Sequence, residues 1–282
     1  MTATATDQLQ TALRRQFDEL VRTETAVRHG DAEAVHDMRV AVRRLRSFLR
    51  TAKPMLDERW VESLRDELDW LGQMLGAVRD LDVLSAALKH QIEELHGGDA
   101  GRSSGLLEPL KSEHDEAHAR LVEGLNDERY AKLLAAVEAA AEAPPSRRSD
   151  KSLRKLAKKE LRRLRKRGTD VPLWLSDEQL HKRRIRVKRA RYAAELVEPS
   201  VGKKASRFID AAKDVQDVLG DHQDAVVAAH RLRLLARQSK TRGAALVAGR
   251  LLEQQEQRRS RTRNHELPPA WHRLQKTGKR AW

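Results

Sequence analysis

The stretch VHDMRVAVRRLRSFLR, from Val35 to Arg50, decides how this 282-residue chain is interpreted. Apolar residues recur in it at alternating intervals of three and four, which is the spacing of one buried face of an α-helix. This apolar stripe consists of Val35, Met38, Val42, Leu45 and Leu49. A second stripe follows one residue later and contains only His36, Arg39, Arg43, Arg46 and Arg50. Arg44 belongs to neither stripe and is expected to face solvent, while Asp31 is predicted to cap the start of the helix.

The rest of the chain has the composition of an all-α protein. Ala, Leu, Arg and Glu dominate, and runs typical of strands are missing. Aromatic residues make up only 4% of the chain, so the core has to be packed with Leu, Val and Ala. The sequence has no cysteine, which excludes disulfides, cysteine-ligated zinc and a thiol nucleophile, and favours a cytoplasmic location. We expect neither a signal peptide nor a membrane span, because no apolar run is long enough for either.

Positive charge is concentrated in the second half of the chain. Residues 1–150 hold 21 Lys and Arg against 28 Asp and Glu, whereas residues 151–282 hold 35 against 14. The net charge of +14 therefore conceals one acidic half and one half with a net charge of +21. A segment this basic indicates a polyanionic partner, which is nucleic acid, an anionic membrane or another phosphate polymer. The alternative is a solvated surface that only keeps the protein soluble.

The two halves of the chain resemble each other. HDMRVAVRRLR, which begins at His36, aligns with HKRRIRVKRAR, which begins at His181, at an offset of 145 residues. LGAVRDLDVL, from Leu75, aligns with LGDHQDAVVA, from Leu219, at an offset of 144. Because both segments match in the same order, we interpret the chain as a tandem duplication of one helical bundle, with repeats at 1–143 and 150–282. APPSRRSD (143–150) is the predicted linker, and HGGDAGRSSG (96–105) is a predicted loop in the first repeat.

The basic stripe favours phosphate recognition over a simple solvated face. Its charges have one sign, whereas a salt-bridged helix face usually mixes signs. The second half repeats the stripe as His181, Arg184, Lys188 and Arg191. Glu195 stands where Arg50 would be, and Ser176 with Gln179 is expected to form a capping box at the start of this helix. Arginine binds phosphate through a planar fork, so two such stripes related by pseudo-twofold symmetry would form a basic groove or channel for a charged polymer.

These segments resemble a known family. VHDMRVAVRRLRSFLR and LHKRRIRVKRARYAAEL are similar to the two signature helices of the CHAD family, the conserved histidine α-helical domain, and LGAVRDLDVL and VQDVLGDHQDA are similar to the segments that follow them. The resemblance covers about residues 7–282 and marks the chain as a single, stand-alone CHAD domain. It implies two antiparallel helical bundles around a basic central groove or pore that binds inorganic polyphosphate, and an association with polyphosphate granules. Carried over by position, the binding residues are His36, Arg39, Arg43, Arg46, His181, Arg184, Lys188, Arg189 and Arg191, with Arg44 and Arg50 as extensions.

Each basic stripe begins with a histidine. His36 and His181 are interpreted as phosphate contacts, and the alternative is a helix-start histidine bonded to backbone or to a carboxylate. Neighbouring arginines should lower the pKa of such a histidine in the free protein, and a bound polyanion should raise it. The cationic neighbours also oppose metal binding, so we expect no metal ion and no cofactor. His114 and His118, four residues apart in HDEAH, are interpreted as part of a polar, exposed helix.

A further basic helix is predicted over residues 153–167. Its apolar stripe consists of Leu153, Leu156, Leu161 and Leu164. Lys158 and Arg165 flank this stripe and are secondary candidates for contact with the polyanion, while the other basic residues offer a second surface for a long chain. The apolar face has no aromatic residue, so binding of this helix to a membrane surface is disfavoured. Near the C-terminus, Trp271 is expected to dock onto the bundle.

Three functions compete to explain this pattern. We favour non-catalytic binding of inorganic polyphosphate. Non-specific nucleic-acid binding is the secondary candidate, because the basic stripes have few aromatic residues on which bases can stack. An enzyme acting on phosphate polymers is disfavoured, since the sequence has no P-loop and no acidic cluster for paired metals. The matched Asp80 and Asp224 are interpreted as partners that hold arginines in place. The sequence predicts neither the oligomeric state nor the preferred polyphosphate length.

Overall fold

The computed structural model describes residues 4–95, 103, 105–147, 152–166, 175–239 and 241–281. The first half of the chain forms α1 (Ala5–Arg28), α2 (Ala32–Ala52), α3 (Glu58–Glu93), α5 (Glu108–Asn126) and α6 (Glu128–Glu142). The second half forms α7 (Leu153–Lys166), α8 (Asp177–Val201), α9 (Lys203–Gln238), α10 (Arg242–Arg261) and α11 (Leu267–Lys279). A 3-10 turn, η1 (Lys53–Met55), follows α2, and a π-helical turn, η2 (Thr262–Glu266), joins α10 to α11. Apart from one isolated bridge, these described residues contain no β-structure, which confirms the all-α prediction.

Side-chain caps fix where both basic helices begin. The carboxylate of Asp31 accepts a hydrogen bond from the backbone N–H of Ala34 at 2.7 Å, at the start of α2. Ser176 and Gln179 form the predicted capping box of α8, in which each side chain accepts from the backbone N–H of the other residue. These bonds satisfy N–H groups that have no acceptor inside the helix. Both caps were predicted from the sequence, and both are confirmed.

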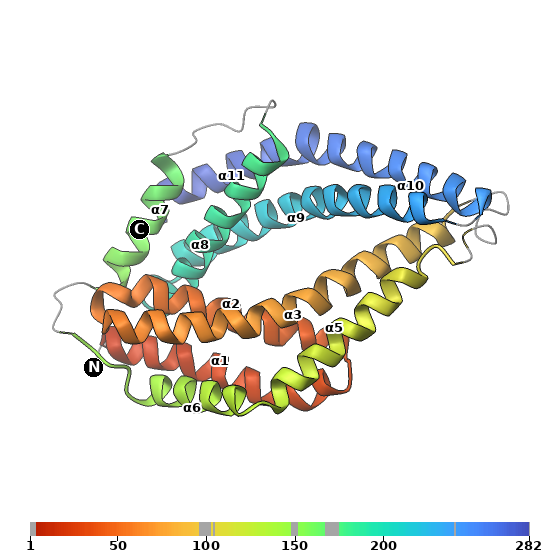
Figure 1. Ribbon diagram of the computed structural model, residues 1–282. Coiled ribbons are helices and arrows are strands. Elements are labelled where there is room, and N and C mark those ends of the chain that lie inside the picture. Colours follow the sequence, from red (N-terminus) through yellow and green to blue (C-terminus); the bar gives the residue numbers. More distant parts are fainter. Residues whose placement is uncertain are drawn as a thin grey trace.

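Each basic helix lies between two other helices of its own half. α2 packs between α1 and α3, and α8 packs between α7 and α9. Figure 1 shows α1, α2, α3, α5 and α6 as one layer and α7 to α11 as another layer above it. Short connections reverse the chain between neighbours, so these helices run antiparallel. The connection from α8 to α9 is the single residue Gly202, whose φ of 70° favours glycine.

The two layers share hydrophobic core at two places. At one end, the core of the first half takes in apolar residues of α7 and α8, among them Leu153 and Tyr192. At the far end, a separate cluster joins Leu88 of α3 to Leu232 of α9 and Leu251 of α10. Burial of these side chains ties the layers together through the hydrophobic effect. Between these two contacts, residues of both layers line a cavity.

The segment that follows α6 runs back along the first half. The backbone N–H of Asp57 donates to the carbonyl of Pro145 at 2.9 Å, and the N–H of Arg147 donates to the carbonyl of Met55 at 2.9 Å. Residues 148–151 and most of the predicted loop at 96–105 lie outside the described residues. The division into repeats at 1–143 and 150–282 therefore stays a prediction. In the ranges that the structure describes, no helix is long and apolar enough to cross a membrane.

The C-terminal helix explains one difference between the two basic helices. Arg183 lies on an arc of α8 that is apolar in α2. Trp271 of α11 is only 4% exposed and packs in the core of the second half, as predicted. The Arg183 guanidinium lies 5.2 Å from the centroid of the Trp271 ring. A cation over an aromatic face is attracted by the ring, so an arginine fits an arc that the indole covers.

Candidate functional site

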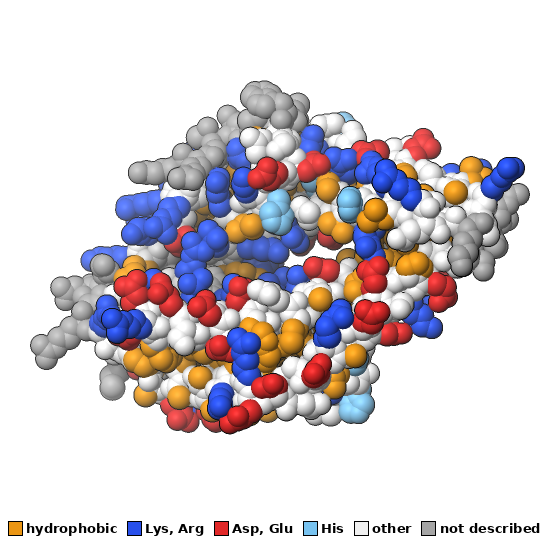
Figure 2. Space-filling model, in the orientation of Figure 1, with side chains coloured by type: hydrophobic (Ala, Val, Ile, Leu, Met, Phe, Trp, Pro, Cys, Tyr) orange, Lys and Arg blue, Asp and Glu red, His pale blue; other side chains and the backbone are white. Residues whose placement is uncertain are grey.

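A cavity of about 640 Å³ lies between the two layers of helices. α2 and α3 line it from one side, and α8, α9 and α10 line it from the other. It brings together most of the predicted stripe residues, namely His36, Arg39, Arg43, Arg44, His181, Arg184, Lys188 and Arg191. We call it the central cavity. In Figure 2, Lys and Arg side chains gather in the hollow between the layers.

The wall of the central cavity is positive, and its charges are unevenly placed. Its Lys and Arg residues are Arg39, Arg43, Arg44, Arg79, Arg184, Lys188, Arg191 and Arg258, and its carboxylates are Asp80, Asp217 and Asp224. When all of these are ionised, five positive charges are in excess. The carboxylates come from α3 and α9, whereas the charged residues that α2 and α8 contribute are all cationic. An anionic ligand is therefore expected to lie next to α2 and α8.

Matching arginines of the two stripes have matching surroundings. Arg39 lies against Gly76 of α3, where a Cβ would be 3.6 Å from the arginine Nη2. Arg184 lies against Gly220 of α9, where the corresponding distance is also 3.6 Å. In both cases a glycine of the predicted Leu-Gly segment lets the guanidinium lie flat against the next helix. These contacts agree with the interpretation of the chain as a duplication.

The carboxylates matched in the sequence behave differently in the two halves. Asp80 forms an ion pair with Arg39 at 3.1 Å, which is the role predicted for it. Asp224 is close enough to Arg184 for their charges to interact, yet no ion pair joins Arg184 to a carboxylate in the described part of the chain. Burial raises the pKa of Asp224, against the opposing effect of the Arg184 charge. Arg184 is therefore less neutralised than Arg39.

The two histidines occupy equivalent positions on the wall of the central cavity. His181 Nδ1 is 3.2 Å from the side-chain oxygen of Gln223. Gln223 aligns with Arg79 in the first repeat, and Arg79 lies beside His36. Burial, and then the charge of Arg79, lower the pKa of His36. The structure thus brings both histidines to the cavity, and their direct contact with phosphate stays a prediction.

The middle of each stripe is the most buried part. Burial, reinforced by the charges of Arg184 and Arg43, lowers the pKa of Lys188 to about 7. Burial also lowers the pKa of Arg43, and the charges of Arg39 and Arg191 act in the same direction. Like charges held this close destabilise one another. A bound polyanion would offset that cost, which makes the cavity better suited to an anion than to water alone.

Several buried donors around the central cavity have no acceptor. The Nε groups of Arg43 and Arg184 and the side-chain nitrogen of Gln216 are buried without a hydrogen-bond partner. Gln216 is only 6% exposed. Such donors are rare in native proteins, because an unsatisfied buried donor costs about 1–3 kcal/mol. An oxyanion in the cavity would supply the acceptors that these groups lack.

Glu195 ties the two basic helices together beside the cavity. It accepts a hydrogen bond from Arg44 Nε at 3.1 Å, and its other oxygen lies 3.3 Å from Arg191 Nε. The Glu195 side chain is 12% exposed. The expectation that Arg44 faces solvent was therefore wrong, because the side of α2 next to Arg43 meets α8. The glutamate that replaces the fifth basic residue of the second stripe neutralises cations of both helices.

Two residues at the end of the first stripe lie outside the central cavity. Arg46 is held by Asp69 of α3 in an ion pair of 2.6 Å. Arg50 lines a separate cavity beside α7. Both residues lie on the predicted face of α2. The basic stripe therefore extends beyond the central cavity. The spacing of residues on α2 could not predict where the cavity ends, because that depends on where the neighbouring helices approach α2.

Three other predicted residues also lie elsewhere. Arg189 is exposed, and it follows Lys188 by one position, which turns it about 100° round α8 and away from the central cavity. Lys158 and Arg165 of α7 do not line the central cavity. The apolar stripe of α7 is buried as predicted, with Leu153 and Leu161 at 1% and 4% exposure. The helix was therefore oriented correctly, but the residues beside its stripe do not reach the central cavity.

The cavity also contains residues that sequence reasoning missed as site residues. Arg79, Arg258, Gln216, Asp217 and Tyr192 all line it. Arg79 lies within, and Gln216 lies beside, the matched segments from which the duplication was inferred, so their position relative to these segments was an available signal. Arg258 comes from α10, in a stretch rich in arginine, and no periodicity distinguishes it from its neighbours.

The remaining histidine pair has structural contacts. His114 Nε2 lies 2.9 Å from Asp82 of α3, and His118 Nε2 lies 3.0 Å from the carbonyl oxygen of Val27. These contacts tie α5 to α3 and to the end of α1. Among the described residues, no group of three or more His, Cys, Asp or Glu side chains is arranged to hold a metal ion.

The fold and the site define an all-α protein of two antiparallel helical bundles with an arginine-rich cavity between them. The chain belongs to the CHAD family, since the model of the CHAD domain matches residues 11–233. This confirms the family inferred from the two signature helices. The CHAD family is associated with polyphosphate, and membership supports a polyphosphate-related role in general terms.

Similar proteins cover nearly all of the chain. Two uncharacterized proteins of Mycobacterium tuberculosis are each 29% identical to it over 287 residues, which is 98% of this chain and 54% of theirs. The chain thus spans about half the length of the curated relatives it matches. The crystal structure of the CHAD domain from the plant Ricinus communis is 28% identical, with a TM-score of 0.69 over 96% of this chain and 92% of that one. PptA from Streptomyces chartreusis shares the fold at 24% identity, with a TM-score of 0.75 over 98% of this chain and 100% of that one.

Proposed function

We propose that this protein is a non-catalytic binding protein for inorganic polyphosphate, and that the polymer lies in the central cavity against α2 and α8. The observation that carries this proposal is the set of buried cations without acceptors, above all Arg43 and Arg184. Every unit of polyphosphate carries negative charge and oxygen acceptors. Arginine forks bind such oxyanions through paired hydrogen bonds, which are roughly twice as strong as neutral ones.

Inorganic polyphosphate fits this cavity better than nucleic acid does. A cavity of about 640 Å³ would be roughly 9 Å on a side if it were a cube. This is less than the width of the major groove alone of a DNA duplex, which is about 12 Å. A duplex therefore does not fit between the layers. Single-stranded nucleic acid is commonly bound by stacking its bases on large aromatic side chains, and among the described residues that line the cavity Tyr192 is the one Phe, Tyr or Trp. Nucleic acid is accordingly a weaker competitor in this proposal.

The acidic residues of the cavity support a binding role without catalysis. Asp80 is engaged by Arg39, and Asp224 lies beside Arg184. Hydrolysis of a phosphate polymer would need an activated nucleophile, commonly a water bound to paired metal ions. We therefore expect no Mg²⁺-dependent release of phosphate. Association with polyphosphate granules in the cytoplasm is part of the same proposal, since a binding domain without catalysis can attach to the stored polymer.

The decisive variant reverses one charge on each basic helix. In R39E/R184E the cavity loses two central cations and gains two anions, so affinity for long-chain polyphosphate should fall by about 100-fold or more. R59E/R207E is the matched control, because both of its arginines are exposed near the starts of α3 and α9 and because the two substitutions change the net charge equally. The control should bind nearly as well as the wild type.

The measurement is a titration of labelled long-chain polyphosphate, with circular dichroism to verify that both variants keep their helices. A folded R39E/R184E protein that binds like R59E/R207E would contradict the proposal, because net charge alone would then explain the affinity.

A further inference from the structure

A second cavity of about 650 Å³ lies where the end of α2, η1 and the start of α3 meet α7. We call it the α7 cavity. The basic residues that line it are Arg50, Lys53, Arg65, Arg147, Lys159 and Arg163, and its acidic residues are Glu58 and Glu160. α7 belongs to the second half of the chain, while the other elements belong to the first. The α7 cavity therefore exists only because the two halves are packed together.

Half of these cations are already neutralised. Lys53 is held by Glu58 at 2.8 Å and by Glu62 at 2.6 Å. Arg147 is paired with Asp57 at 3.1 Å, and Arg163 is paired with Glu160. Because each of these three cations is already paired with a carboxylate, it contributes little net positive charge toward a ligand in the α7 cavity.

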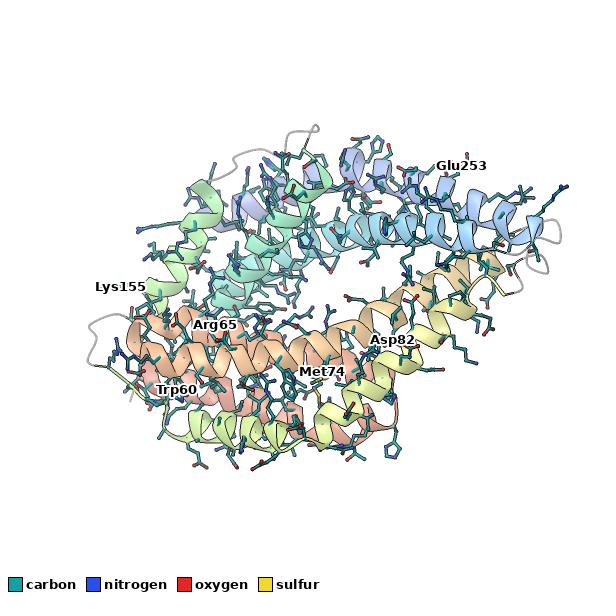
Figure 3. The ribbon with its side chains drawn as sticks, in the orientation of Figure 1. Trp60, Arg65, Met74, Asp82, Lys155 and Glu253 are labelled. Atoms are coloured by element: carbon teal, nitrogen blue, oxygen red, sulfur yellow. The ribbon has the colours of Figure 1, made fainter. Side chains whose placement is uncertain are left out.

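The other three cations have no such partner. In the described part of the chain, no carboxylate forms an ion pair with Arg50, Arg65 or Lys159. The Nε of Arg65 is, in addition, buried without a hydrogen-bond partner. Figure 3 labels Arg65 on the side of α3 that faces α7 and α8, and Lys155 on the outer side of α7. Unpaired cations from three different helices thus converge on one cavity.

The α7 cavity continues the basic stripe of the central cavity. Arg43 lines the central cavity and Arg50 lines the α7 cavity, and both lie on the same face of α2. Seven residues separate them, which is about 10 Å along a helix. On α8, Lys188 lines the central cavity, and the next residue, Arg189, lies close to Arg50 and Arg65. The two cavities are therefore connected by cations on both basic helices.

We propose that the α7 cavity is a second anion-binding site, which holds a further segment of the same polyphosphate chain that occupies the central cavity. This proposal rests on the proposed function. It adds a second site to that function, and with it a dependence of affinity on the length of the polyphosphate chain. When one chain reaches both cavities, the second contact becomes intramolecular and raises affinity by about 10²–10⁴-fold. Long chains are then bound much more tightly than tripolyphosphate, which fills one cavity only.

The test compares two double variants with long-chain polyphosphate and with tripolyphosphate. R65A/K159A removes two unpaired cations of the α7 cavity, Arg65 on α3 and Lys159 on α7. R59A/K155A removes exposed cations from the same two helices, outside the cavity, and is the matched control. We expect R65A/K159A to bind the long chain at least about tenfold more weakly than R59A/K155A, because the second contact is lost. The affinity of tripolyphosphate for the central cavity should be the same in the two variants, because that cavity is unchanged.

Equal binding of the long chain by the two variants would overturn the second site while leaving the proposed function intact. Failure of the wild type to bind either probe would overturn both proposals. K159A alone serves as a second variant if R65A/K159A unfolds, because Lys159 is exposed and forms no ion pair with a described residue. Long-chain affinity of K159A equal to that of K155A would count against the α7 cavity in the same way.

Discussion

The buried Lys188 makes polyphosphate binding depend on pH in a way that can be calculated. Burial and the charges of Arg184, Arg43, Arg39 and Arg191 lower the pKa of this lysine to about 7. The free protein therefore holds it about half neutral at pH 7. A polyanion in the central cavity stabilises the charged form, so binding raises the pKa towards the ordinary value of 10.5. Binding of the polyanion is consequently accompanied by uptake of protons from the solvent.

The size of the effect follows from linkage. A group whose pKa rises on binding strengthens affinity at low pH, and this gain is lost as the pH rises above the pKa of the free protein. Between pH 7 and pH 8.5, the ammonium form of Lys188 falls from about one half to about 3% in the free protein, while the bound form stays charged. The dissociation constant should therefore rise about fifteenfold over this interval.

The assay is a titration with labelled long-chain polyphosphate at several pH values, together with calorimetry in two buffers of different ionisation enthalpy. A long chain is used because only its terminal phosphates titrate near neutral pH. Lys188→Arg is the control, since arginine stays charged over the whole range. We expect Lys188 to contribute an uptake of about half a proton at pH 7 and about one at pH 8.5 in the wild type. K188R should lose this contribution and keep only the uptake by the cavity histidines. An identical pH dependence in K188R and the wild type would refute the reasoning.

Two further predictions concern the charges around the central cavity. In E195Q, Arg44 and Arg191 lose their shared carboxylate, so the free protein should lose about 1–3 kcal/mol of stability, seen as a lower Tm. Its affinity for polyphosphate should rise several-fold, with E253Q on the exposed side of α10 as control; unchanged affinity would mean that the two arginines do not contact the polymer. Binding should also weaken steeply with salt. With about six to eight phosphates neutralised, the slope of log K against log salt concentration should lie between about −4 and −6, by analogy with single-stranded nucleic acid, and a slope near −1 would exclude a multi-residue site.

The helices and their orientation were predictable because they follow from local spacing. Val35, Met38 and Leu49 of the first stripe are fully buried, as the intervals of three and four required. Asp31 and Ser176 cap the helices that they were predicted to cap. Such features depend on residues within one or two turns of each other, and a sequence records these relations directly.

The boundaries of the site were not predictable in the same way. Arg46 and Arg191 occupy matched positions, yet Arg46 is held by Asp69 while Arg191 lines the central cavity. Glu195 meets Arg44 across 151 residues of sequence, and no periodicity predicts that contact. Which basic residues remain available to a ligand depends on pairings between distant helices. The stripes therefore predicted the chemistry of the site, and only the packing revealed its extent.

The most direct test of the account is a competition experiment on the wild-type protein. Labelled long-chain polyphosphate is bound at near-physiological salt and challenged with single-stranded DNA and with heparin, matched in charge concentration. If the central cavity recognises bare phosphate chains, unlabelled polyphosphate should displace the probe and the other two polyanions should not. Displacement by all three at equal charge would contradict the account, because a generic basic surface would then suffice.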